Sequence, residues 1–164
     1  MTTQSPGSRE MSTASTARTG RGYSTAYPVE QSPQEVFAAI LDVGAWWTGQ
    51  VEGRADEVGA EFTYRHPPQH YSRQRVVQLE PGRRVIWQVT ESHLSFIPEP
   101  GEWTGTQIVF DIVPAGGGTE LRFTHVGLVP DIECFGACST GWLHYVNGSL
   151  RSLITTGEGL PDPW

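Results

Sequence analysis

The chain has no lysine, only two cysteines and no long apolar run. All 11 basic residues are arginines, against 18 acidic residues, so the formal net charge is −7. This balance argues against nucleic acid as a partner, because a phosphate-binding surface needs a net basic face. No apolar run approaches the roughly 18 residues of a membrane-spanning helix, and two cysteines are too few for a disulfide scaffold. We therefore expect a cytoplasmic, bacterial protein with no membrane span and no nucleic-acid partner.

Patterns that carry common catalytic chemistry are also missing. The chain shows no nucleophile–base pair, no paired acids and no phosphate-binding loop, so acyl and phosphoryl transfer have no residues to rest on. His125, Cys134 and Cys138 give the spacing H-x8-C-x3-C, which superficially resembles a zinc pattern. His144, however, lies about 240° around a helix from Cys138 and cannot easily be a fourth ligand. We predict no catalytic residue, metal or cofactor, and expect both thiols to pack against the sheet.

Composition divides the chain into a tail and one domain. Met1–Gly22 is rich in Ser, Thr, Gly and Arg and contains almost nothing apolar. Such a segment cannot bury enough surface to offset its ordering entropy, so we predict a disordered tail over residues 1–22. It lacks the apolar core of a secretory signal and the amphipathic period of a transit peptide. Residues 23–164 are long enough for one domain with its own core.

The longest predicted element is a helix from Ile132 to Thr156. Asp131 can cap its start, and Gly157 is a typical C-terminal glycine. The helix carries a broad apolar stripe, which needs a large sheet to cover. We therefore expect the helix to lie across the strands of the rest of the chain. The stripe recurs at steps of three and four residues, at Cys138, Trp142, Tyr145, Val146, Ser149, Leu150 and Leu153.

Two short helices are predicted after a first strand at Tyr23–Val29. Ser32 is the N-cap of a capping box that opens the first of them. Asp42–Thr48 follows as a second short helix or turn that carries Trp46 and Trp47. Because adjacent side chains cannot both face the same way, we expect one tryptophan to pack inward and the other to lie near the surface or a cavity mouth.

Alternating apolar residues predict a series of antiparallel strands separated by turns. We therefore expect an α+β fold: a curved antiparallel β-sheet of about six or seven strands wrapped around a long C-terminal helix, with two short helices after the first strand. The predicted strands of the series are Glu61–His66, Tyr71–Leu79, Arg84–Thr90, Thr104–Val113 and one that begins at Thr119.

Several short motifs, taken in their order along the chain, resemble one known superfamily. They are Ser32–Phe37, Trp46-Trp47, Glu80–Val85 with Trp87, Thr119–Leu121 with Thr124–Leu128, and Gly141-Trp142 with Ser149-Leu150. On these residues the chain resembles the START-like (SRPBCC) superfamily, whose fold is the helix-grip, and within it the activator of Hsp-90 ATPase homologue-like family. The resemblance implies a deep, mostly apolar cavity between the sheet and the last helix, used in the superfamily for lipids, polyketides and other hydrophobic small molecules. It also implies that some relatives are cyclases or aromatases.

On this fold, ten mostly aromatic residues converge on the space under the long helix. Ordinary core packing would need many of them, whereas a ligand pocket would supply partners for the polar tips of tyrosine and tryptophan. We predict a cavity on the order of a few hundred Å³ between the helix and the sheet face that bears Trp87, Phe110 and Phe123. The candidate ligand-binding residues are Trp46, Phe62, Tyr64, Trp87, Ile108, Phe110, Phe123, His125, Trp142 and Tyr145.

Several histidines and arginines have roles that the sequence leaves open. His125 shares a strand face with apolar residues, so it either reaches a ligand, as a hydrogen-bonding group or proton shuttle, or is bonded to backbone at the strand end. Arg73 and Arg75 either face solvent, or one of them reaches into the cavity to hold an anionic group. Three histidines near loops are expected at the surface or the cavity mouth: His66, His70 and His93.

Three functions remain open at this point. The first is a binding module that encloses a hydrophobic or aromatic small molecule, lipid or polyketide-like, without a reaction. The second is a polyketide cyclase- or dehydratase-type enzyme that uses His125 or a pocket tyrosine as acid or base. The third is an interaction protein that modulates a chaperone ATPase. We expect the first, in a monomer or weak homodimer, with a hydrophobic small molecule as partner and a protein partner left open.

Overall fold

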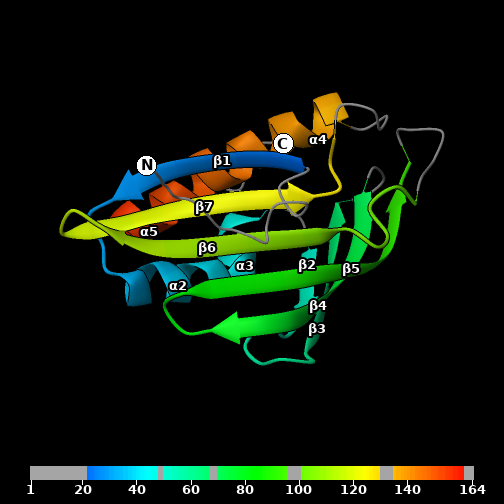
Figure 1. Ribbon diagram of the computed structural model, residues 1–164. Helices are drawn as coiled ribbons and strands as arrows, with labels where there is room; N and C mark the ends of the chain where they lie inside the picture. The colour runs from blue at the N-terminus through cyan, green and yellow to red at the C-terminus, as the bar shows by residue number, and fades with distance from the viewer. Residues whose placement is uncertain (1–21, 48–49, 67–69, 96–100, 130–134, 161–164) are drawn as a thin grey trace, which may run out of the picture.

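The computed structural model describes residues 22–47, 50–66, 70–95, 101–129 and 135–160. Seven strands form one antiparallel sheet in the order β1-β7-β6-β5-β4-β3-β2 (Figure 1). The predicted tail lies outside the described residues, except that Gly22 begins the first strand. The strands are β1 (Gly22–Val29), β2 (Gln50–Gly53), β3 (Glu61–His66), β4 (His70–Glu80), β5 (Arg84–Leu94), β6 (Gln107–Ala115) and β7 (Gly118–Val126).

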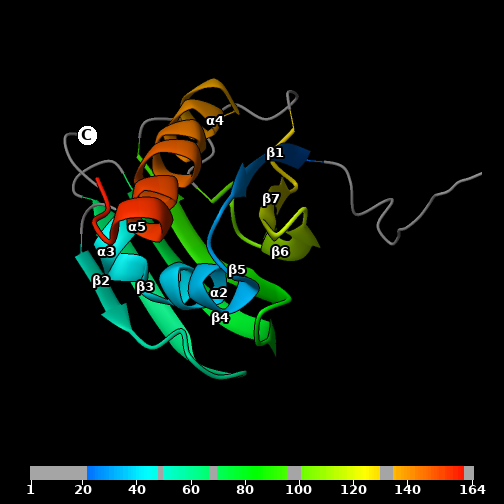
Figure 2. The ribbon, with the colours of Figure 1, turned by 90° about the vertical axis from the view of Figure 1, so that its left-hand side faces the viewer.

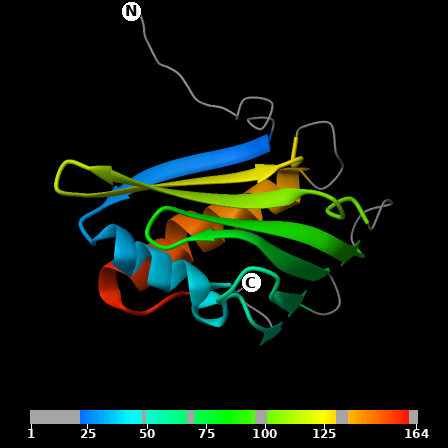
Figure 3. The ribbon, with the colours of Figure 1, turned by 60° about the horizontal axis from the view of Figure 1, so that its bottom comes forward.

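Helices cover the concave side of this sheet. Two short ones, α2 (Pro33–Leu41) and α3 (Val43–Trp46), follow β1. The C-terminal helix is continuous through α4 (Phe135–Trp142), a π-helix labelled η1 (Leu143–Leu150), and α5 (Arg151–Thr156). Figure 2 shows the strands curving around this long helix, and Figure 3 shows the helix crossing the sheet obliquely. The predicted α+β architecture, including the two short helices and the long one, is confirmed.

Local sequence signals explain several of the element ends. The Ser32 hydroxyl accepts a hydrogen bond from the backbone N–H of Glu35 at 3.2 Å, and the Glu35 carboxylate accepts one from the Ser32 N–H at 2.9 Å. This is the predicted capping box, which satisfies two backbone donors at the start of α2. Strands β6 and β7 join through Gly116 and Gly117, both at positive φ, as a two-residue hairpin turn requires. Gly157 ends α5 in the left-handed conformation, as predicted.

The middle of the C-terminal helix differs from the expected α-helix. Residues Leu143–Leu150 are π-helical, with backbone hydrogen bonds from residue i to i+5. The hydroxyl of Tyr27 on β1 donates to the carbonyl oxygen of Val146 within this stretch at 2.7 Å. A π-helix has more residues per turn than an α-helix, so the buried face after it moves by one residue along the sequence. Ile154 is buried there, whereas the predicted Leu153 is only partly buried. The predicted start at Ile132 and the Asp131 cap lie outside the described residues.

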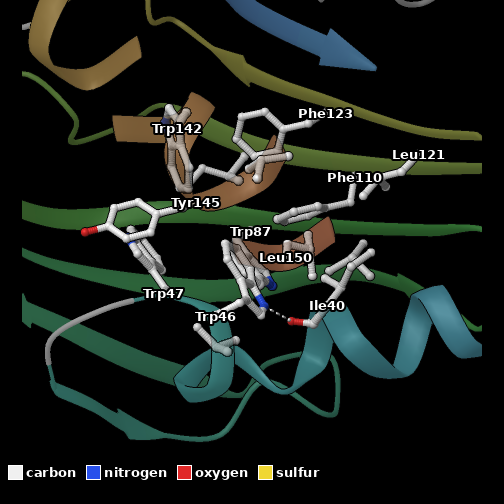
Figure 4. Close-up of a cluster of buried hydrophobic side chains, with 14 of the residues drawn as sticks. Ile40, Trp46, Trp47, Trp87, Phe110, Leu121, Phe123, Trp142, Tyr145 and Leu150 are labelled. Carbon is white, nitrogen blue, oxygen red and sulfur yellow. Dashed lines mark hydrogen bonds between the residues drawn. The ribbon is translucent and has the colours of Figure 1, made fainter. Parts of the chain in front are cut away.

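The core between the helices and the sheet is unusually rich in tryptophan (Figure 4). Trp46 and Trp47 are both buried, at 0% and 2% exposure, so neither lies at the surface. Trp47 lines a cavity, which is the other position predicted for one of the pair. Trp47 follows the end of α3 in an extended conformation, which brings its ring back beside that of Trp46 at 6.1 Å and 11°. The Trp46 indole N–H donates to the carbonyl oxygen of Ile40 at 3.2 Å. Trp46 therefore fills the space under the centre of the sheet, beside Trp87 and Phe110, and Trp47 lies next to it.

Candidate functional site

A cavity of about 340 Å³ lies between the long helix and the end of the sheet formed by β3 and β4. It does not coincide with the predicted position below Trp87, Phe110 and Phe123. Trp46 occupies that region, with its ring 6.4 Å from Trp87 and 6.0 Å from Phe110. The actual cavity is lined by Trp47, Tyr64, His66, His70, Trp103, Ala137, Cys138, Gly141, Trp142 and Tyr145.

Three of the ten predicted site residues line this cavity, namely Tyr64, Trp142 and Tyr145. The other seven lie in the packed core and do not line the cavity, and their role in binding stays a prediction: Trp46, Phe62, Trp87, Ile108, Phe110, Phe123 and His125.

Sequence reasoning overlooked Trp103, and it did not count Trp47 or His70 among the ligand-binding residues, although it expected His70 at the surface or the cavity mouth. The hairpin register gives the missing signal for His70, because β3 and β4 pair His66 with His70 and Tyr64 with Ser72. This register places His70 close to the predicted Tyr64, with their rings 4.8 Å apart. No comparable local signal marks Trp103.

His125 is sealed inside a hydrogen-bond chain. Its Nδ1 accepts from the Trp142 indole N–H at 2.9 Å, and its Nε2 lies 2.8 Å from the Thr106 hydroxyl. Thr106 in turn donates to the carbonyl oxygen of Trp103 at 2.6 Å. An indole nitrogen only donates, so His125 is neutral and carries its proton on Nε2. Burial lowers its pKa to about 3, and the neighbouring His70 adds to that shift. Both ring nitrogens of His125 bond side chains, so the ring neither reaches the cavity nor bonds the backbone. This arrangement differs from both alternatives that the sequence left open.

The loop after β7 leaves space for this chain of hydrogen bonds. Gly127 has a φ of 104°, a conformation that residues with side chains rarely adopt. A Cβ atom at this position would lie 2.6 Å from the Thr106 side chain. Glycine at 127 therefore allows Thr106 to approach His125.

His70 lies on the cavity wall and is oriented from below by polar residues of the same strand. Its Nε2 is 3.1 Å from the Ser72 hydroxyl, which also accepts a hydrogen bond from the Gln74 amide at 2.5 Å. Its ring meets Trp103 edge to face at 4.5 Å and Tyr64 at 4.8 Å. Burial lowers the pKa of His70 to about 3, with a contribution from nearby His66, so the ring is neutral.

The remaining wall is mostly aromatic, with Ala137, Cys138 and Gly141 on the helix side, and none of its described residues is an acid or an arginine. Trp47 stacks on Tyr64 at 4.0 Å, and Trp103 stacks on Trp142 at 5.7 Å. Burial raises the pKa of the Tyr64 hydroxyl, although its hydrogen-bonding interaction with Tyr145 opposes that shift. Flat rings on several sides favour a flat guest.

The open alternatives for the arginines and cysteines are settled in part. Ser72 and Gln74 on β4 face inward. Arg73 and Arg75 alternate with them along the strand, so both arginines point away from the cavity. Arg73 forms an ion pair with Glu91 at 3.5 Å on the outer face. Cys138 is buried as expected, but it is disulfide-bonded, so the prediction of a free thiol there is wrong. Cys134 lies outside the described residues.

The described part of the chain holds no group of three His, Cys, Asp or Glu side chains placed to bind a metal ion. Within the same residues, no helix is long and apolar enough to cross a membrane.

A family model described as "Activator of Hsp90 ATPase homolog 1-like protein" matches residues 30–155. The chain belongs to this family. The match spans every strand and helix from α2 to η1 and most of α5, so it covers both walls of the cavity. The resemblance inferred from the sequence motifs is thereby confirmed. No curated protein matches the chain.

Solved structures share the fold over most of the chain. The Aha1 dimer from Colwellia psychrerythraea is 26% identical, with a TM-score of 0.66 over 83% of this chain and 97% of that one. Protein MLL2253 from Mesorhizobium loti is 18% identical, with a TM-score of 0.65 over 82% and 96%. CalU16 from Micromonospora echinospora is 15% identical, with a TM-score of 0.57 over 81% and 74%. The helix-grip fold is thus shared with proteins of low sequence identity.

Proposed function

We propose that this protein binds a hydrophobic, aromatic small molecule in the cavity between the long helix and strands β3 and β4. The observation that carries the proposal is the cavity itself, about 340 Å³ in volume and walled by aromatic rings. Ligand sites are typically concave, mostly apolar and supplied with a few polar groups, at volumes from about 300 Å³ upward. His70 and the Tyr64–Tyr145 pair supply those polar groups here.

Filling the cavity from the helix side tests this proposal. Gly141 is buried and lines the cavity, so Gly141→Leu places a side chain in the binding space. Gly136 lies on the same helix but is exposed, and a Cβ there would meet nothing within 4 Å. Gly136→Leu is therefore the matched control for the gain in helix propensity, about 1 kcal/mol at either site.

The readout is intrinsic tryptophan fluorescence during titration with 2-ethylnaphthalene. Wild type and Gly136→Leu should saturate with micromolar dissociation constants, near −8 kcal/mol, whereas Gly141→Leu should lose saturable binding while it stays folded. Equal binding by all three proteins would place the ligand elsewhere, and no saturation by wild type would remove the proposal.

The same geometry weighs against the cyclase or dehydratase alternative. Both ring nitrogens of His125 are occupied by Trp142 and Thr106, and its lowered pKa makes it a poor acid or base near neutral pH. The raised pKa of Tyr64 makes that hydroxyl a poor base. Binding without a reaction is the simpler use of these residues.

The chaperone alternative rests on the family's description alone, and no contact among the described residues adds to it. The Colwellia protein forms a dimer, and a weak homodimer remains our expectation for this chain. Sedimentation velocity over a range of protein concentrations distinguishes a monomer from such a dimer.

A further inference from the structure

A line of polar side chains runs along the inner face of β4 and ends at the cavity. Gln74, Ser72 and His70 alternate with outward-facing residues, so all three share the buried face. The Gln74 amide Nε2 donates to the Ser72 hydroxyl at 2.5 Å, and the same hydroxyl lies 3.1 Å from Nε2 of His70. Such a line is unusual beneath an aromatic pocket, because every buried polar atom in it needs a partner.

The hydrogen-bond partners fix which nitrogen of His70 carries the proton. Ser72 is fully buried, and its oxygen already accepts from Gln74. A hydroxyl has one proton to donate and two lone pairs, so Ser72 could also accept from His70, but its own proton would then have no acceptor among the described residues. Ser72 therefore donates to Nε2, and the neutral ring of His70 carries its own proton on Nδ1.

The protonated nitrogen of His70 is available to a guest. Nδ1 of His70 makes no hydrogen bond to any other described residue, while the ring as a whole lines the cavity. Edge-to-face contacts with Tyr64 and Trp103 hold the ring in place. His125 has the opposite tautomer, with Nδ1 unprotonated and Nε2 protonated. Both of its ring nitrogens form hydrogen bonds within the protein. The cavity thus offers a fixed, uncharged donor in a wall whose described residues include no acid and no arginine.

We infer that the ligand is a neutral, planar aromatic molecule with a carbonyl oxygen, which accepts a hydrogen bond from Nδ1–H of His70. This inference rests on the proposed function, since it names the ligand class of the same cavity. A carboxylate is disfavoured, because it would lose its hydration with no arginine in the described wall to compensate. An aromatic hydrocarbon of the same size would bind but would leave the donor unpaired.

Three probes of matched size separate these cases for the full-length protein. They are 2-acetylnaphthalene, 2-ethylnaphthalene and 2-naphthoate, which carry a carbonyl, no polar group and a negative charge. The ketone should bind roughly threefold to tenfold more tightly than the hydrocarbon, and 2-naphthoate should bind most weakly. His70→Phe should abolish the preference, so that the ratio of the affinities for the ketone and the hydrocarbon falls to about one, whatever the change in the absolute affinities. Ser72→Ala, which frees the ring from its orienting donor, should weaken the ketone preference in the same way.

Nitrogen-15 NMR of the histidine rings tests the tautomers without any ligand. We expect His70 to be protonated on Nδ1 and His125 on Nε2, so that two histidines of one buried cluster show opposite tautomers. Protonation of His70 on Nε2 would mean that the Gln74 amide is reversed, and it would overturn the inference.

The binding results separate the two claims. Equal affinity for the ketone and the hydrocarbon in wild type would also overturn the inference while leaving the proposed function intact. Failure of all three probes to bind would overturn the proposed function, and the inference with it.

Discussion

Trp142 contributes to the structure through both its ring and its N–H group. The ring packs against Phe123 at 4.8 Å and Trp47 at 5.1 Å, and the N–H occupies Nδ1 of His125. Trp87 is equally buried and packs against Phe110 at 4.9 Å, but its indole nitrogen has no partner among the described residues. The two tryptophans therefore differ in hydrogen bonding more than in packing.

Replacing each of these tryptophans by phenylalanine isolates that difference. Both changes remove the same volume, but Trp142→Phe also leaves Nδ1 of His125 buried without a donor, which costs about 1–3 kcal/mol. Urea unfolding should therefore show a larger loss of stability for Trp142→Phe than for Trp87→Phe. A loss for Trp87→Phe that equals or exceeds it would show that the His125 hydrogen bond adds nothing measurable.

At the scale of elements, the π-helix is held from both sides. Tyr27 binds Val146 from β1, and on the other side the Ser149 hydroxyl donates to the carbonyl oxygen of Trp46 at 2.8 Å. The same hydroxyl accepts from the backbone N–H of Leu160 at 2.8 Å. Ser149 thus joins the long helix to α3 and to the chain that follows α5.

Ser149→Ala should accordingly destabilise the protein by about 1–3 kcal/mol, because it leaves two backbone groups without this partner. Ser139, on α4, is partly buried and bonds only the carbonyl oxygen of Gly136 in its own helix, at 3.2 Å. Ser139→Ala should stay within about 0.5 kcal/mol of wild type. Thermal unfolding of the two variants side by side measures the difference, and similar melting temperatures would contradict this role of Ser149.

The elements that local sequence encodes were predicted, and those that depend on distant contacts were not. The capping box at Ser32 and the helix end at Gly157 each arise from a few neighbouring residues. The π-helix escaped prediction because its partner Tyr27 lies 119 residues from Val146. Strand β2 was missed because its residues are mostly exposed and carry no apolar alternation.

The position of the cavity depends on contacts of the same long-range kind. Trp46 turns under the centre of the sheet and fills it, while Trp47 lines the cavity beside β3 and β4. No period in the sequence shows how two adjacent tryptophans will turn. The predicted site therefore shares Trp142 and Tyr145 with this cavity, whereas its sheet residues Trp87, Phe110 and Phe123 do not line it.

At the scale of the whole molecule, two buried histidines link folding to pH. Burial lowers the pKa of both His70 and His125 to about 3, whereas the pKa of histidine in an unfolded chain is about 6.5. Below about pH 6.5, the unfolded chain therefore binds more protons than the folded protein. The stability that these neutral rings provide is complete above about pH 6.5 and is lost progressively as the pH falls toward 3.

Unfolding free energies measured between about pH 7 and 5, above the range in which most carboxylates titrate, should therefore fall as the pH is lowered. The slope should approach about 1.4 kcal/mol per pH unit for each histidine at the acidic end. His125→Asn should reduce the slope, even though its stability at neutral pH is also lower. An unchanged slope in this variant would mean that His125 is protonated in the folded protein.

In our proposal the aromatic cavity beside β3 and β4 is a ligand site, whereas Trp46 and Trp87, under the centre of the sheet, belong to the packed core. The most direct measurement is a titration of the nitrogen-15-labelled protein with 2-acetylnaphthalene, followed through the indole N–H signals. The signals of Trp47, Trp103 and Trp142, which line the cavity, should shift and saturate together, and those of Trp46 and Trp87 should move least. Shifts led by Trp46 and Trp87, or no saturable shift at all, would contradict the account.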